Sequence, residues 1–384
     1  MSQDIFRNGR GLRAGWRILL WFCALLVSCI PVGVFFGIAM ALSGELSFAS
    51  PGHAPKMATW VTLSAEGTLF AFLFPLTALI AVFIEKRPTR SLGLAFHSRW
   101  IREFGAGLLS GTLLLSLVVL ILRAVGVYQV SGPQEGIGGA ALWGILFGAT
   151  FLGVGFFEEF MFRGYLLQTL VGGCGVPAAF IITCLFFGLV HVPNHGETFV
   201  GILNVFAAGA MLAVIVLRTR SLWLAVGLHA TWDWSQNFLY GTPDSGIVTP
   251  GGLFHTTVSH GPGWLGGASD GPEGSVVALV ILIAATLYFS RCRWLVPSLE
   301  SKALWDRYVL RIEPGPVFDP RTSLEFDLDP VSTPSTAQRV EFDLDPVSTP
   351  SAIQTLEFDL APAPASPDSN GEVPREDNGK ERPA

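Results

Sequence analysis

Long apolar stretches separated by short polar segments fill the chain between residues 16 and 294. A helix needs about 20 apolar residues, with a range of roughly 17–25, to cross the hydrocarbon core of a bilayer. The pattern therefore predicts an all-α, polytopic membrane protein with about eight transmembrane helices. The eight stretches are 16–42, 60–84, 104–127, 140–170, 176–192, 198–217, 222–240 and 275–294.

The first stretch has some features of a cleaved signal peptide, because arginines precede it and Ala-Met-Ala stands near its end. The apolar core of a signal peptide is only about 7–15 residues long. The stretch at 16–42 is longer than that. We therefore expect it to be a retained membrane anchor.

The composition supports membrane insertion. Half of the 384 residues are hydrophobic, and 14% are charged, against about 25% in a typical soluble domain. The net charge of −6 is unevenly spread, since residues 295–384 hold 17 acidic and 8 basic residues. The remainder is slightly basic and contains no dense basic tract, so the sequence does not favour nucleic-acid binding.

The distribution of Lys and Arg predicts the orientation. Positively charged residues favour the cytoplasmic side of a membrane protein. Eight spans with both termini in the cytoplasm place every basic segment on that side, and we expect insertion in the cell inner membrane. The segments are Arg7–Arg17, Lys86–Arg102, Arg218 with Arg220, and Arg291 with Arg293.

Three regions follow from these patterns: a basic cytoplasmic N-terminus (1–15), an eight-helix membrane domain (16–294) and an acidic, Pro-rich tail (295–384). In the tail, LEFDLDPVSTPS at 324–335 recurs as VEFDLDPVSTPS at 340–351, a period of 16 residues. Units of this composition cannot bury a core, so we expect a disordered tail. The repeats are either protein-docking motifs or an unselected duplication.

Ionisable residues inside apolar spans are the strongest functional signal, because each is costly to insert into a bilayer. The fourth span contains Glu158, Glu159 and Arg163, the fifth ends at His191, and the seventh carries His229 and Asp233. Residues four apart share a helix face, so Glu159 and Arg163 can form an ion pair. Glu158, rotated about 100° from Glu159, has no local cation, which suits a general base.

Glu158 and His191 are predicted to lie at the same depth in the membrane. The turn between the fourth and fifth spans is centred near Cys174 and Gly175, and Glu158 and His191 lie 16 residues to either side of it. At 1.5 Å per residue, both lie about 24 Å from the turn. His229 and Asp233 are four apart and can face the same cavity. The sequence therefore predicts one intramembrane site on three helices.

Two chemistries fit such a site. Glu158 can take a proton from water held by the histidines, and a histidine can stabilise the oxyanion after attack on a peptide carbonyl. Alternatively, Glu158, His191 and His229 can bind a divalent metal such as zinc, as in a metalloprotease. The chain contains no His-Glu-x-x-His and no Gly-x-Ser-x-Gly sequence, which argues against the hydrolases that those motifs mark.

The motifs Glu158-Glu159-x-x-x-Arg163, Phe187-x-x-x-His191 and His229-x-x-x-Asp233 together resemble the CPBP family of intramembrane proteases. This family comprises CAAX prenyl endopeptidases and the bacteriocin-processing or self-immunity proteins called Abi. The resemblance covers residues 140–240. It implies hydrolysis of a peptide bond in a membrane-associated substrate.

The resemblance also implies roles for individual residues. Glu158 matches the glutamate that activates water, Glu159 and Arg163 match its supporting pair, and His191 and His229 match the histidines of the second and third motifs. Asp233 stands where many members have Asn, so it either donates to an oxyanion or accepts from a histidine. The family has been described both as metal-dependent and as metal-free glutamate proteases, and the resemblance does not decide between the two.

Two other functions are compatible with the pattern: a non-catalytic membrane immunity or scaffold protein, and a proton-coupled transporter that uses the buried carboxylates as a relay. No internal repeat of the transporter kind is visible in the body. Outside the motifs, we expect Glu66 to line a cavity or an interface and Glu197 and His195 to be solvated. Residues 241–274 are predicted to form an external loop rich in Gly and Pro.

Overall fold

The computed structural model describes residues 7–8, 11–43, 59–132, 137–194, 197–245, 252–259 and 261–311. The tail repeats, His195 and most of the basic N-terminus lie outside these residues. Within them the fold is all-α apart from two short antiparallel strand pairs, which confirms the predicted fold class. The pairs are β1 (Arg7–Asn8) with β2 (Gly11–Leu12), and β3 (Tyr128–Ser131) with β4 (His255–Val258).

The long helices agree with the predicted apolar stretches to within a few residues. Three of them run directly into π-helical segments, where the backbone hydrogen bonds reach one residue further. In chain order, the helices and the π-helical segments that continue them are α1 (Ala14–Ser43), α2 (Thr59–Leu79) with η1 (Ile80–Ile84), α3 (Trp100–Ala124), α4 (Ile137–Glu159) with η3 (Phe160–Leu166), α5 (Leu167–Cys174), α6 (Val176–His191), α7 (Phe199–Thr219), α8 (Trp223–Trp234) with η4 (Ser235–Leu239), and α10 (Val276–Arg291).

Six helical segments of the described chain are long and apolar enough to cross a membrane: 14–43, 64–84, 100–124, 139–174, 199–219 and 268–291. They correspond to six of the eight predicted stretches. The fifth and seventh stretches form shorter helices, α6 and α8 with η4. The chain is thus a polytopic integral membrane protein.

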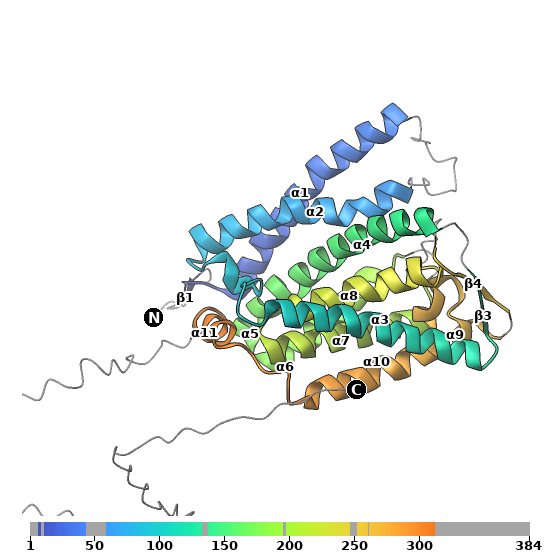
Figure 1. The fold of residues 1–384 in the computed structure, drawn as a ribbon. Helices are drawn as coiled ribbons and strands as arrows, with labels where there is room; N and C mark the ends of the chain where they lie inside the picture. Colours follow the sequence, from blue (N-terminus) through green and yellow to red (C-terminus); the bar gives the residue numbers. More distant parts are fainter. Residues whose placement is uncertain are drawn as a thin grey trace, which may run out of the picture. The chain divides into compact units, whose positions relative to one another are not determined.

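Shorter elements connect the long helices. Figure 1 shows β3, β4 and α9 at one end of the helix bundle and α5 and α11 at the other. The elements are η2 (Thr89–Leu92), α9 (Gly263–Gly266), η5 (Ala268–Gly274) and α11 (Leu299–Tyr308).

The predicted boundary of the tail at residue 295 is too early, because α11 follows it. The hydroxyl of Ser298 accepts a hydrogen bond from the Ser301 N–H and caps the start of this helix. Trp305 and Val309 are buried, and the Arg220 guanidinium lies 4.5 Å from the centre of the Trp305 ring. The sequence of this helix is polar, so the hydrophobic pattern did not predict it. A few anchoring residues, rather than an apolar face, hold the helix in place.

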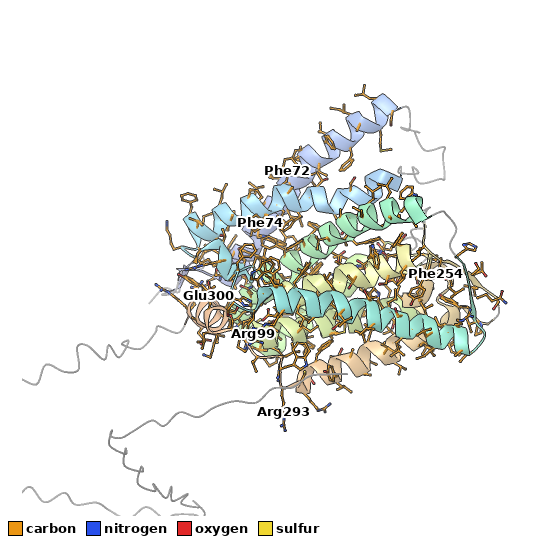
Figure 2. The ribbon with its side chains drawn as sticks, in the orientation of Figure 1. Phe72, Phe74, Arg99, Phe254, Arg293 and Glu300 are labelled. Carbon is orange, nitrogen blue, oxygen red and sulfur yellow. The ribbon has the colours of Figure 1, made fainter. Side chains whose placement is uncertain are left out.

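The arginine-rich segments gather at the α11 end of the bundle. Arg90 pairs with Glu300, and the Arg99 guanidinium donates to the Trp294 carbonyl. Arg218 donates to the carbonyl of Cys292 at 2.7 Å. Figure 2 shows Arg99 and Glu300 close to this end, with Phe254 at the opposite end. The basic segments that the sequence assigned to one side of the membrane therefore lie on one side of the structure.

The contact between α3 and α8 is the most extensive of the described helix pairs, and glycines allow it. A Cβ on Gly107 would lie 2.3 Å from the Leu224 carbonyl oxygen, and one on Gly227 would lie 2.5 Å from the Phe104 carbonyl oxygen. Small residues at such positions let helix backbones approach closely in membranes. This approach fixes α8, and with it His229 and Asp233, against the bundle.

We expect Gly107→Ala to lower the free energy of unfolding by about 1–3 kcal/mol, because the new methyl group can be accommodated only by separating α3 from α8. Gly105→Ala is the matched control on the same helix, since nothing lies within 4 Å of a Cβ at that position. That control should be neutral or slightly stabilising, as Ala favours helix over Gly. Thermal unfolding of the detergent-purified variants measures both, and equal stability of the two would contradict the packing argument.

Candidate active site

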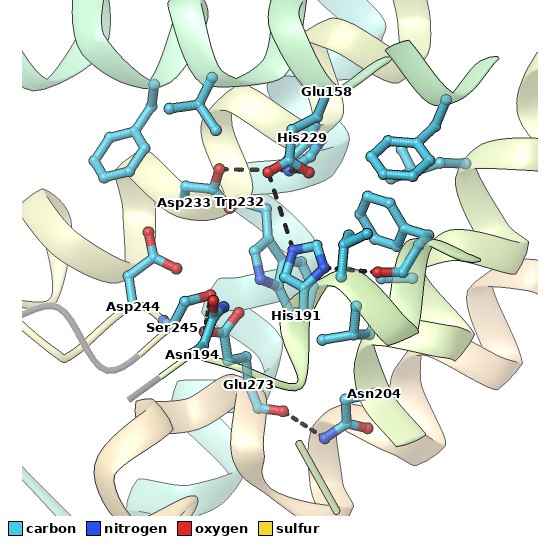
Figure 3. A pocket seen from close by; sticks show the side chains of 18 of the residues that line it. Glu158, His191, Asn194, Asn204, His229, Trp232, Asp233, Asp244, Ser245 and Glu273 are labelled. Atoms are coloured by element: carbon cyan, nitrogen blue, oxygen red, sulfur yellow. Dashed lines mark hydrogen bonds and ion pairs between the residues drawn. The ribbon is translucent and has the colours of Figure 1, made fainter. Parts of the chain in front are cut away.

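The predicted site residues converge on one cavity of about 470 Å³. Glu158 comes from the last turn of α4, His191 from the end of α6, and His229 and Asp233 from α8. All four line the cavity, as Figure 3 shows. The structure brings together the residues whose convergence the sequence predicts.

Glu158 faces both histidines. Its Oε1 lies 4.0 Å from the Nε2 of His191, and its Oε2 lies 3.7 Å from the Nε2 of His229. These distances are too long for direct hydrogen bonds. They match a spacing that a water molecule or a substrate oxygen can bridge. The Oε2 atom is buried and has no hydrogen-bond partner within the described residues.

Each histidine is oriented through its other ring nitrogen. The Nδ1 of His191 lies 2.7 Å from the Phe187 carbonyl, one turn earlier on α6. A carbonyl can only accept, so this Nδ1 carries a proton and Nε2 is left for the cavity. The Nδ1 of His229 lies 2.9 Å from Oε1 of Glu159 and is held in the same way, with its Nε2 3.6 Å from Asp233. Both rings therefore present Nε2 to the cavity.

Glu159 and Arg163 form the ion pair that their spacing predicts. Both side chains are 0% exposed, and Arg163 Nη1 donates to Glu159 Oε1 at 2.7 Å. Nη2 donates to the Gly209 carbonyl of α7 at 3.1 Å, and the guanidinium lies 4.2 Å from the centre of the Phe187 ring. Arg163 thus links α4, α6 and α7, while Glu159 links this group to His229.

Arg163 lies in the π-helical segment η3, which begins directly after Glu159. Such segments are rare and frequently occur at functional sites, because the extra residue per turn redirects side chains. Leu222 and Leu92 pack around Gly164 within the same segment. The π-helical segment therefore changes the direction of the side chains between the residues that line the cavity and the residues that pack behind the cavity.

Glu66 of α2 also lines the cavity, as its isolated position in an apolar span suggested. Its helix approaches α4 at a pair of glycines, where a Cβ on Gly153 would lie 2.9 Å from the Gly67 Cα. The Oε2 of Glu66 is buried with no hydrogen-bond partner in the described chain.

Sequence reasoning missed the polar residues at the other end of the cavity. Asp244, Ser245 and Glu273 come from the predicted external loop, yet they line the cavity, as does Asn204 of α7. An acidic residue in a Gly- and Pro-rich segment carries no local signal of burial. The packing of η5 against α7 brings Glu273 to the cavity, and a hydrogen bond from the Ser245 N–H to the Glu273 carboxylate holds Ser245 beside it.

Glu197 was expected to be solvated, and it too lines the cavity. Partial burial and the neighbouring carboxylate of Asp270 raise the pKa of Glu197 to about 7.

A metal site is not formed by these residues as they stand. In the described chain, no group of three His, Cys, Asp or Glu side chains is arranged to hold a metal ion. Even so, two atoms bound to one zinc ion at about 2.0–2.2 Å lie at most about 4.4 Å apart, and the separations of Glu158 from His191 and His229 fall within that limit.

Residues 140–235 match the family model of the Rce1-like type II CAAX prenyl endopeptidases. This segment is similar to the domain of those endopeptidases. The predicted relation to CAAX-type membrane proteases is thereby confirmed for the part of the chain that holds Glu158, His191, His229 and Asp233. The Rce1-like domain supports protease activity at the membrane as the general function. The chain has no match among the curated proteins and none among the solved structures.

Proposed function

We propose that the protein is an intramembrane endopeptidase in which Glu158 activates water for attack on a peptide bond. The observation that carries the proposal is the position of the Glu158 carboxylate, which faces two imidazole Nε2 atoms at 3.7 and 4.0 Å across a cavity in an Rce1-like domain. The substrate would be a membrane-associated or membrane-delivered peptide.

In the proposed reaction, a water molecule sits between Glu158 and the two histidines. Glu158 takes its proton while the oxygen attacks the carbonyl carbon, which forms a tetrahedral oxyanion. His229 has the carboxylates of Glu159 and Asp233 on either side of its ring. This negative charge would stabilise a second proton on the ring, so that Nε2–H donates to the oxyanion.

The oxyanion then collapses, the C–N bond breaks, and Glu158 returns its proton to the leaving amine. Asp233 would hold the His229 ring rather than touch the oxyanion, because an ionised carboxylate has no proton to donate. This role accounts for Asp233 at a position where many members of the CPBP family carry Asn.

We further propose that the cavity opens away from the cytoplasm. The residues at its polar end follow α6 (Asn194), follow η4 (Asp244) and precede α10 (Glu273), at the end of the bundle opposite the arginine-rich segments. With the basic end in the cytoplasm, the substrate would be a peptide that reaches the outer face of the inner membrane.

The test is hydrolysis by the full-length protein in proteoliposomes, with products of a synthetic peptide library identified by mass spectrometry. Cleavage at defined bonds supports the proposal. Solute uptake that depends on a proton gradient, without cleavage of any peptide, would contradict the proposal and indicate a transporter instead.

A further inference from the structure

A second cavity, of about 720 Å³, lies where the start of α1 meets α5 and α6. Figure 1 shows β1, α5 and α11 at that end of the bundle. Three arginines, Arg13, Arg17 and Arg311, line the cavity, and no Asp or Glu is found among the described residues that do so. The wall of the cavity is therefore positively charged, and the proposed reaction gives it no task.

Two successive glycines of α5 bring these arginines together. A Cβ on Gly173 would lie 2.5 Å from the Ala14 Cβ, and one on Gly172 would lie 2.8 Å from the Val309 carbonyl oxygen. The first contact holds the start of α1 against α5, and the second holds the chain that follows α11 against α5. The arginines of both segments line one cavity because α5 has no side chains at these two positions.

Arg13 has an unsatisfied hydrogen-bond donor in the cavity wall. Its Nε is buried and lacks a hydrogen-bond partner within the described residues, and none of their carboxylates forms an ion pair with it. Arg17 is 5% exposed, and its Nε is likewise buried without a partner in that part of the chain. Buried donors without an acceptor are uncommon in folded proteins. An acceptor bound in the cavity would satisfy both guanidinium groups.

The nearby carboxylate of Glu85 does not neutralise the arginines. Glu85 accepts from Arg17 and also forms an ion pair with Arg87, whose Nε lies 2.9 Å from its Oε2. The Tyr165 hydroxyl donates to the same carboxylate. Burial, with Glu85 opposing it, lowers the pKa of Arg87, and the neighbouring guanidinium groups lower it further. One carboxylate thus serves two buried arginines, and the excess of positive charge favours an anion beside them.

We propose that this cavity binds a phosphate group and that an anionic lipid of the adjoining leaflet carries it. The planar guanidinium of Arg13 matches a phosphate through two parallel N–H donors, and Arg17 offers its Nε–H. The first N–H groups of α1, at Ala14 and Gly15 in the cavity wall, have no acceptor within the helix and favour an anion. This inference does not depend on the proposed peptidase function.

Apolar side chains favour a lipid as the source of the phosphate. Ile18, Leu170 and Ile182 line the cavity together with the arginines. Ile182 is also 44% exposed on the apolar helix α6, so the cavity borders a surface that acyl chains can cover. Basic pockets between transmembrane helices bind anionic headgroups in this way. A soluble phosphate would gain nothing from the apolar wall.

The test measures binding of phosphatidylglycerol to the full-length protein in detergent micelles by native mass spectrometry. Phosphatidylcholine with the same acyl chains is the probe without net charge, and inorganic phosphate is the soluble probe. Arg13→Gln removes the unpartnered guanidinium. Arg102→Gln is the matched control, because Arg102 is an exposed arginine of α3 at the same end of the bundle and does not line the cavity.

We expect wild-type protein to bind phosphatidylglycerol about tenfold more tightly than phosphatidylcholine, the effect of one hydrogen bond to a charged group. Arg13→Gln should remove most of this preference, and Arg102→Gln should keep it. Without lipid, Arg13→Gln should unfold at the wild-type temperature, because its guanidinium has no partner within the described chain.

Equal affinities of the wild type for the two lipids would overturn the proposal, as would the same loss of preference in Arg13→Gln and Arg102→Gln. Binding of inorganic phosphate that depends on Arg13, without a preference for phosphatidylglycerol, would overturn the lipid as the source and assign the site to a soluble phosphate. Arg13-dependent binding of phosphatidylglycerol that inorganic phosphate fails to displace supports the lipid.

Discussion

Replacing Glu158 by Gln should lower the rate of peptide hydrolysis by about three orders of magnitude or more, the upper part of the range for loss of a general base. The amide has nearly the volume of the carboxylate, and neither Glu158 oxygen makes a short hydrogen bond that the fold would lose. The variant should therefore insert and unfold like the wild type. Steady-state cleavage of the best library peptide measures the loss.

Two comparisons make this result specific. Glu300→Gln changes the same chemical group at the arginine-rich end and should retain wild-type cleavage. Thermal unfolding of Glu158→Gln in detergent shows whether the protein is intact. A stable Glu158→Gln variant that still cleaves at the wild-type rate would rule out glutamate-activated water as the mechanism.

Replacing Arg163 by Met should destabilise the protein by about 3–5 kcal/mol, because removal of one partner of a buried ion pair leaves an uncompensated charge. Glu159 would remain 0% exposed without its guanidinium. The substitution also removes the hydrogen bond to the Gly209 carbonyl and the contact with the Phe187 ring. Chemical or thermal unfolding in detergent, with the yield of folded protein, measures the effect.

The matched control is Lys302→Met, which breaks an ion pair of the same i,i+4 spacing on α11. That pair is largely exposed, and such pairs contribute at most about 1 kcal/mol. The double variant Arg163→Met with Glu159→Gln removes both buried charges and should be more stable than Arg163→Met alone. A double variant no better than the single one would show that packing, rather than charge, explains the role of Arg163.

The sequence by itself determined six of the membrane spans, the arginine-rich end and the meeting of Glu158, His191, His229 and Asp233. These features can be predicted because charged residues are rare in an apolar span. In addition, the rise per residue of a helix converts the number of residues between two positions into a difference in depth in the membrane. The chemical roles of the four residues remain the prediction that the Glu158→Gln experiment tests.

Only the tertiary structure decided the other features. In a polar segment an acid that will be buried looks like one that stays in water, so Asp244 and Glu273 could not be recognised beforehand. The partners of Arg163 on α6 and α7, the close approach of α3 and α8 at Gly107, and the anchoring of α11 by Trp305 join residues far apart in the chain. Such contacts depend on how helices pack, and no local pattern of residues encodes them.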